Sequence, residues 1–436
     1  MHFFRFNEKN VNKSVDFVHV FVYTRIYGGG FMMIYRSDYV DAVRPFIDQP
    51  LVKILAGIRR CGKSTIFEML KEELIRRGIE PNHIISRIYT AMDIPANISA
   101  REMYDELLAE MQGKGRCYLF LDEIQEVDGW EKTVNSLLEN TDCDIYVTGS
   151  NSKLMAGEIS TYLTGRYISI PVYTLSFREY LAFRKEMSDA ERSLSQQEQL
   201  EEYIRFGGFP IVALGNYEAQ SAYQIVNGIY YTVVSRDIVN RHRINRQDLF
   251  DRIVKYIIEN TGKTFSASSI TTFLKSEHRS ISSESIYNYL RWLKEAFIIF
   301  PCPRYDLQGK SILKTQEKYY LADISLKYAL LGYNRKMLDG VMENIVYLEL
   351  KRRGYEVFVG KNGVKEIDFV AVRRDEKIYV QVCVQLPANS DRETANLMEI
   401  RDHYPKYIVT MNRMDIGIDN GIRIVHLEDF LLDQRW

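Results

Sequence analysis

The segment Gly57 to Thr65, "GIRRCGKST", combines glycines, a lysine and hydroxyl side chains in the order typical of a phosphate-binding loop. In such a loop the glycines let backbone N–H groups approach a β-phosphate, Lys63 neutralises the β- and γ-oxygens, and the Ser64 hydroxyl holds Mg²⁺. The residues between the glycines need only permit the turn, because the groups that bind there are backbone amides. The predicted nucleotide-binding residues are Gly57, Ile58, Arg59, Arg60, Cys61, Gly62, Lys63, Ser64 and Thr65. A glycine-rich turn that binds nothing is the alternative.

A second motif, "CYLFLDEIQ" from Cys117 to Gln125, is an apolar run that ends in two carboxylates. We expect Asp122 to join Ser64 on the metal side and Glu123 to polarise the water that attacks the γ-phosphate. The cofactors predicted from the two motifs are therefore ATP and Mg²⁺. An edge strand that happens to end in acidic residues is the other interpretation.

Two further polar positions are candidates for catalysis. The run "YVTGSNSKLM" places Ser150 or Asn151 where a side chain could sense the γ-phosphate, although a polar strand end is also a common turn or helix cap. Arg166, in "LTGRY", could act as an arginine finger in its own chain or from a neighbouring subunit. A solvated arginine ahead of a strand is the simpler reading.

The order of elements around these motifs predicts an α/β fold. Short apolar runs recur and alternate with amphipathic helices; the runs are 51–57, 83–89, 117–123, 144–150 and 166–172. Alternation of this kind is typical of a parallel sheet covered on both faces. We assign residues 33–198 to this core, with residues 1–32 as an extension or a wrongly assigned start.

The rest of the chain reads as three more parts. Residues 199–244 are helical and predict a lid over the nucleotide. Residues 245–336 give three helices and a strand, the order of a winged helix. Its third helix would present Ser283, Tyr287, Asn288, Arg291 and Lys294 to DNA. Because its cationic content is small, plain packing is the alternative to DNA contact.

Taken together, the motifs resemble those of AAA-type P-loop ATPases of bacteria and archaea that carry a C-terminal domain of unknown function. The resemblance runs from about Met33 to the C-terminus, and it rests on "GIRRCGKST", "LFLDEIQ", "YVTGSNSKLM", "LTGRY", "YTLSFREYL", "GGFP", "SRDIV" and "EIDFV". It implies ATP binding and a sheet with an additional strand beside a catalytic glutamate. It suggests ring assembly only by analogy, so an oligomer and a monomer both stay open.

The last part, residues 337–436, resembles a restriction-endonuclease-like α/β fold. Glu343 and Asp368 stand where that fold has its first two metal-binding carboxylates. The third motif fails, because Gln381 and Cys383 replace a carboxylate and a lysine. We therefore expect a nuclease-like domain without nuclease activity, unless Lys365 or Lys377 reaches the site.

Bulk composition limits the remaining possibilities. The 57 basic and 58 acidic residues nearly cancel, so the chain has no global field that would draw it to nucleic acid. The five scattered cysteines favour reduced thiols in a cytoplasm over disulfides or a zinc site. The apolar stretch near the N-terminus contains Asp16, His19 and Arg25, which argues against a signal peptide or a membrane span.

The sequence thus predicts an ATP-binding, Mg²⁺-dependent ATPase with slow turnover. It would act as a nucleotide-gated switch that engages an unidentified macromolecule, protein or DNA, through its winged-helix and C-terminal parts. An ATP-regulated DNA-binding or DNA-processing protein is the first alternative. A degenerate scaffold that binds no nucleotide is the second.

Overall fold

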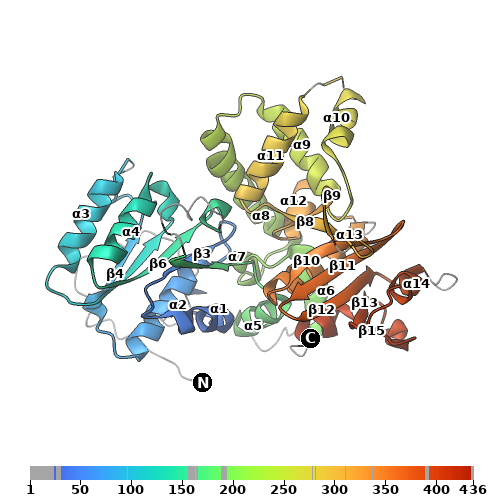
Figure 1. Ribbon diagram of the computed structural model, residues 1–436, viewed down its shortest axis with the longest axis horizontal. Helices are drawn as coiled ribbons and strands as arrows, with labels where there is room; N and C mark the ends of the chain where they lie inside the picture. Colours follow the sequence, from blue (N-terminus) through green and yellow to red (C-terminus); the bar gives the residue numbers. More distant parts are fainter. Residues whose placement is uncertain are drawn as a thin grey trace. The chain divides into compact units, whose positions relative to one another are not determined.

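The computed structural model describes residues 24–25, 31–95, 97–155, 163, 165–187, 194–276, 278–279, 281–309, 311–334, 337–387 and 392–433 (Figure 1). The chain divides into two compact units, Met1–Val172 and Tyr173–Trp436. Most of the predicted extension, 1–32, lies outside the described residues. Its described parts are two short antiparallel strands, β1 (Thr24–Arg25) and β2 (Phe31–Met32).

The first unit is built on a five-stranded, wholly parallel sheet in the order β4-β5-β6-β3-β7. Its elements, in chain order, are α1 (Ser37–Val43), β3 (Val52–Ala56), α2 (Lys63–Arg76), β4 (Ile84–Ile88), α3 (Ala100–Met111), β5 (Cys117–Asp122), α4 (Trp130–Asn140), β6 (Cys143–Gly149) and β7 (Tyr167–Pro171). Figure 1 shows α1 and α2 on one side of the sheet and α3 and α4 on the other. The predicted parallel, doubly covered sheet is confirmed.

The central strands of this sheet are buried along their whole length, which is why they read as continuous apolar runs. Two charged residues interrupt those runs, Lys53 on β3 and Asp144 on the neighbouring β6, and both side chains are fully buried. They form an ion pair, and the Tyr146 hydroxyl donates a second hydrogen bond to Asp144 at 2.8 Å. Burial lowers the pKa of Lys53, so Asp144 is needed to keep it charged. The pair links β3 to β6 inside the sheet.

The second unit begins with helices. They are α5 (Phe177–Met187), α6 (Gln196–Phe206), α7 (Pro210–Ala213), α8 (Ala219–Val233), a π-helical turn (Val234–Asn240), α9 (Gln247–Glu259), α10 (Ala267–Ser276), α11 (Ser283–Glu295) and, further on, α12 (Ser325–Leu331). The order of α9, α10, α11 and the strands that follow is the one expected from the sequence. The winged-helix assignment itself stays a prediction.

An eight-stranded mixed sheet forms the rest of this unit, in the order β14-β15-β13-β12-β11-β10-β8-β9. Its elements are β8 (Ile299–Asp306), β9 (Ser311–Leu321), α13 (Leu338–Arg352), β10 (Glu356–Asn362), β11 (Lys365–Arg373), β12 (Glu376–Cys383), α14 (Arg392–Met398), β13 (Lys406–Thr410), β14 (Gly417–Asp419), β15 (Ile422–His426) and α15 (Leu427–Leu432). Strand β8 pairs in parallel with β10. The boundary expected between 336 and 337 therefore runs through a continuous sheet.

A buried carboxylate, Asp323, links the turn before α7 to the start of α12 in the second unit. Asp323 is only 2% exposed and accepts hydrogen bonds from the backbone N–H of Gly208 (2.8 Å) and from the N–H and hydroxyl of Ser325. Gly207 has φ 73°, and a Cβ there would lie 1.8 Å from the Asp323 carboxylate. The "GGFP" motif thus needs glycine at position 207, because the backbone has positive φ there and the Asp323 carboxylate occupies the space that a side chain would take.

We predict that Gly207→Ala lowers the free energy of unfolding by about 3 kcal/mol, because the new methyl group overlaps Asp323 and the residue has positive φ. Gly228→Ala is the matched control: this glycine lies inside α8, and no atom is within 4 Å of the added carbon. It should stabilise the protein by about 0.5–1 kcal/mol through helix propensity. Urea unfolding followed by circular dichroism measures both, and equal midpoints for the two variants would contradict the prediction.

Candidate nucleotide-binding site

The predicted phosphate-binding loop joins the buried strand β3 to helix α2. Gly62 stands ahead of the helix with φ 102°, and Arg60 also has a positive φ of 67°. Gly57 opens the loop where the backbone of Val172 passes, and a Cβ on Gly57 would lie 2.0 Å from the Val172 carbonyl oxygen. Both glycines of the motif are therefore required by geometry.

Sequence reasoning missed a residue that supports this loop. Arg36, ahead of α1, is 2% exposed, and its Nη1 donates to the carbonyl oxygen of Cys61 at 2.8 Å. Its guanidinium also lies over the Tyr39 ring. Cys61 is itself fully buried, and burial raises the pKa of its thiol. A lone arginine 21 residues before the motif carries no signal in the sequence, because only folding brings α1 beside α2.

The four residues expected to handle phosphate and metal lie together. The Ser64 hydroxyl donates to Asp122 Oδ2 at 2.7 Å. Lys63 Nζ donates to the carbonyl oxygens of Gly57 (3.1 Å) and Ile58 (3.3 Å) and lies 3.6 Å from Glu123 Oε1. Strand β6 lies between β3 and β5, so the acidic strand end is one strand removed from the loop, as the resemblance implies.

Burial and charge act differently on the two carboxylates. Burial raises the pKa of Asp122, and the neighbouring charge of Glu123 raises it further. Burial alone would raise the pKa of Glu123 as well, but the positive charges of Lys63 and Arg59, together with hydrogen bonds from Gln125 and Ser150, hold that pKa below its ordinary value. Glu123 is thus kept as a carboxylate, the form that can accept a proton from water.

Three polar residues around the carboxylates were given no firm role by the sequence. The Thr148 hydroxyl donates to Asp122 and accepts from the backbone N–H of Glu123 (3.1 Å). The Ser150 hydroxyl donates to Glu123 Oε2 at 3.1 Å, and Gln125 Nε2 donates to the same oxygen at 2.5 Å. Ser150 was one of two sensor candidates, and it is the one that contacts the site.

The other catalytic candidates lie differently. Asn151 is buried, but its Oδ1 accepts from the backbone N–H of Lys153, as a turn residue would. Arg166 is half exposed and pairs with Glu139 at 2.9 Å. Arg59 lies 3.6 Å from Glu126. A catalytic role for Asn151 or Arg166 stays a prediction.

The donor set fits Mg²⁺ bound together with a nucleotide. Among the described residues no group of three or more His, Cys, Asp or Glu side chains could hold a metal by itself. Mg²⁺ in nucleotide sites usually takes one or two protein oxygens and completes its shell with phosphates and water. Ser64 Oγ and Asp122 Oδ2 are oxygen donors 2.7 Å apart and would supply that protein share.

In the second unit, the predicted vestige of a nuclease site holds a lysine that the sequence analysis did not consider. Lys318 on β9 is 4% exposed, and its Nζ lies 3.2 Å from Glu343 Oε2, 2.9 Å from Glu366 Oε1 and 3.7 Å from Asp368 Oδ1. Burial, and then the charge of Glu343, raise the pKa of Asp368 to about 8. The structure thus brings Glu343 and Asp368 together around an ammonium group.

Gln381 and Cys383, which replace the third motif, lie near this cluster, whereas the alternative lysines Lys365 and Lys377 contact other residues. Gln381 Oε1 accepts from the backbone N–H of Asp368 at 3.2 Å, and Cys383 is buried with a pKa raised to about 12 by burial. Lys365 instead pairs with Glu399, and Lys377 lies over tyrosine rings. Neither lysine forms an ion pair or a hydrogen bond with Glu343 or Asp368, both of which are among the described residues.

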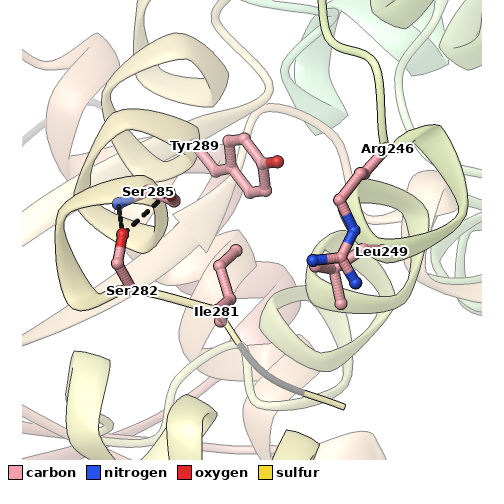
Figure 2. A pocket seen from close by; sticks show the side chains of 6 residues that line it. All are labelled: Arg246, Leu249, Ile281, Ser282, Ser285 and Tyr289. Carbon is pink, nitrogen blue, oxygen red and sulfur yellow. Dashed lines mark hydrogen bonds between the residues drawn. The ribbon is translucent and has the colours of Figure 1, made fainter.

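A pocket of about 440 Å³ opens between the starts of α9 and α11. It is lined by Arg246, Leu249, Ile281, Ser282, Ser285 and Tyr289. Figure 2 shows Arg246 and Tyr289 on opposite sides, with the Ser282 hydroxyl bonded to the backbone N–H of Ser285 as the cap of α11. None of its lining residues belongs to the phosphate-binding loop. Tyr287 and Arg291, expected on the DNA-facing side of α11, are well exposed, and Arg291 lies 3.8 Å from Glu295.

In the described part of the chain, no helix is both long enough and apolar enough to cross a membrane. Residues 49–181 match the AAA domain family, and residues 197–336 match a domain of unknown function, DUF8612.

Similar proteins extend these matches. The Walker-type ATPase PABY2304 of Pyrococcus abyssi aligns in structure with 68% of this chain and 95% of its own, at a TM-score of 0.50 and 15% identity, which is a likeness of fold. An uncharacterized protein of Methanocaldococcus jannaschii, MJ1544, is 31% identical over 78% of this chain and 77% of its own. An uncharacterized protein of Haemophilus influenzae is 34% identical over 402 residues, 92% of this chain and 99% of its own. The chain therefore belongs to the same family as this Haemophilus influenzae relative, and its residues 49–181 match the AAA domain.

Proposed function

We propose that the protein binds Mg·ATP at the loop Gly57–Thr65 and hydrolyses it slowly, as a switch that engages a macromolecular partner. The observation that carries the proposal is the meeting of Lys63, Ser64, Asp122 and Glu123 at the ends of β3 and β5. A turn without a ligand has no need of a lysine, a hydroxyl and two carboxylates in one buried place. The AAA-domain match over 49–181 supports the same conclusion.

In this proposal each side chain has a separate task. The loop amides and Lys63 bind the phosphates, while Ser64 and Asp122 hold Mg²⁺, which supplies charge neutralisation at the β- and γ-oxygens. Glu123 accepts the proton of the attacking water. Without nucleotide, Lys63 faces Glu123 and Ser64 bonds to Asp122. Binding must replace the Lys63–Glu123 contact by a contact between Lys63 and phosphate, so the two nucleotide states differ at these two side chains.

The chain path offers a route from this change to the second unit. The N–H of Val172 donates to the carbonyl oxygen of Ala56 at 2.8 Å, directly before the loop. Val172 is the last residue of the first unit, and Thr174 and Leu175 are bound firmly inside the second: Leu175 N–H donates to Gly208, and the Thr174 hydroxyl donates to Ala322. A shift of the loop would therefore act on the segment that anchors the second unit.

We expect Lys63→Ala to abolish ATP binding and turnover, because the substitution removes the positive charge at the start of α2 that would neutralise the phosphates. Glu123→Gln should bind ATP normally and lose about 10²- to 10³-fold in kcat, since its amide cannot take the proton of water. Phosphate release and binding of a fluorescent ATP analogue measure these effects. Lys114→Ala, on a loop outside the site, is the control, and turnover of Lys63→Ala equal to wild type would refute the site.

The switch is tested by partner capture. Glu123→Gln should accumulate with ATP bound, so an affinity-tagged form should retain a partner in the presence of ATP that Lys63→Ala does not retain. Mass spectrometry of proteins and sequencing of nucleic acid in the same eluate compare the protein and DNA alternatives. DNA retained with a steep loss between 50 and 200 mM salt would favour the DNA-binding alternative. Identical eluates from the two variants would contradict the switch.

We further propose that the C-terminal part is nuclease-like without nuclease activity. The positive charge at the centre of the cluster is the Lys318 ammonium group. It lies within 3.7 Å of the carboxylates of Glu343, Glu366 and Asp368. Burial and the charge of Glu343 raise the pKa of Asp368, so protons compete with a divalent cation for this carboxylate.

Purified protein should accordingly cut neither DNA nor RNA when Mg²⁺ or Mn²⁺ is added at pH 7. Labelled single- and double-stranded substrates, followed on denaturing gels, provide the measurement. Divalent-dependent cleavage that disappears in Asp368→Asn would show instead that the cluster is an active site.

A further inference from the structure

Gln125, in the third position after Asp122, contacts the carboxylate that we assign to water activation, and neither the sequence motifs nor the comparisons give it a role. Its Nε2 donates to Glu123 Oε2 at 2.5 Å and lies 3.4 Å from the Ser150 hydroxyl, which donates to the same oxygen. Both donors thus converge on Oε2. The other oxygen, Oε1, faces Lys63 at 3.6 Å.

The contact is held at a cost in local stability. Gln125 Oε1 is buried and finds no hydrogen-bond donor among the described residues. It lies against Gly149, where an added Cβ would be 2.3 Å away. Turning the amide over would give that oxygen no better place, since it would then face the Glu123 carboxylate. Glu123 itself has φ 53°, unusual for a residue with a side chain. An unsatisfied buried oxygen and a strained backbone beside a reacting group indicate a functional arrangement.

We propose that Gln125 is a positioning residue for ATP hydrolysis, which fixes the Glu123 carboxylate through Oε2 and leaves Oε1 for the attacking water. The inference rests on the proposed function. When phosphates draw Lys63 away, Oε1 loses its partner and becomes the acceptor for a proton of water. Oε2 stays held by Gln125 and Ser150, and the Glu123 N–H stays bonded to Thr148 at 3.1 Å. The carboxylate therefore keeps one orientation after its ion pair is lost.

The test separates kcat from nucleotide affinity. Gln125→Leu keeps the size of the side chain but removes the donor, so kcat should fall about tenfold to a hundredfold, as expected when a reacting group is misplaced. The dissociation constant for a fluorescent ATP analogue should change less than twofold, because the Gln125 amide donates to Glu123 and Ser150 rather than to the phosphate-binding loop. Gln112→Leu, beyond the end of α3, is the matched control and should leave both quantities unchanged.

A double-mutant cycle with Glu123→Gln distinguishes positioning from general damage to the fold. If Gln125 acts through Glu123, adding Gln125→Leu to Glu123→Gln should lower kcat by less than twofold more. Full additivity, an unchanged kcat in Gln125→Leu, or a raised kcat would each overturn the inference; a raised kcat would mean that Gln125 restrains Glu123. If the wild-type protein bound and hydrolysed no ATP, the proposed function would fail before Gln125 was tested.

Discussion

The hydrogen bond from Val172 to Ala56, with Gly57 in contact beside it, is the constraint on which the rest of the structure depends. It fixes where β3 ends and therefore where the phosphate-binding loop begins. It also fixes the point at which the chain leaves the first unit, because Tyr173 opens the second. Only a glycine allows so close an approach of two backbones. The first glycine of the motif thus serves the fold as well as the proposed nucleotide site.

Three clusters of buried charge among the described residues differ in how the charges are balanced. Lys53 and Asp144 form a closed pair inside the first sheet and have no chemistry left to do. Around Lys318 the negative charges exceed the positive charge of the lysine, and protonation of Asp368 reduces the imbalance. At the nucleotide site, Lys63 and Glu123 neutralise each other across 3.6 Å, a separation that a phosphate group can replace. Only the last arrangement is suited to exchange one partner for a ligand.

The comparisons and the geometry bear on different parts of the argument. Similarity to the Haemophilus influenzae relative covers 92% of this chain, so both units have counterparts in that relative. The AAA-domain match extends over 49–181 and includes Lys63, Ser64, Asp122 and Glu123, whereas the supporting Arg36 lies ahead of it. What the second unit recognises has to be read from its own surface, where the pocket beside α11 and the Lys318 cluster are the features that stand out.

The sequence by itself determined the parallel α/β core and the roles expected of Lys63, Ser64, Asp122 and Glu123, because these lie in short motifs whose spacing is set by one strand, one turn and one helix. Tertiary structure alone decided which polar neighbours reach them. Arg36 and Thr148 follow no spacing rule, since helix packing and strand pairing bring them in from other elements. Gln125 stands in the same motif as Glu123, but only the turn that follows β5 brings its amide back to that carboxylate. The same reason explains Lys318: the lysines that the sequence suggests, Lys365 and Lys377, lie on β11 and β12, whereas the ammonium group comes from β9, in a sheet whose strand order no local pattern reveals.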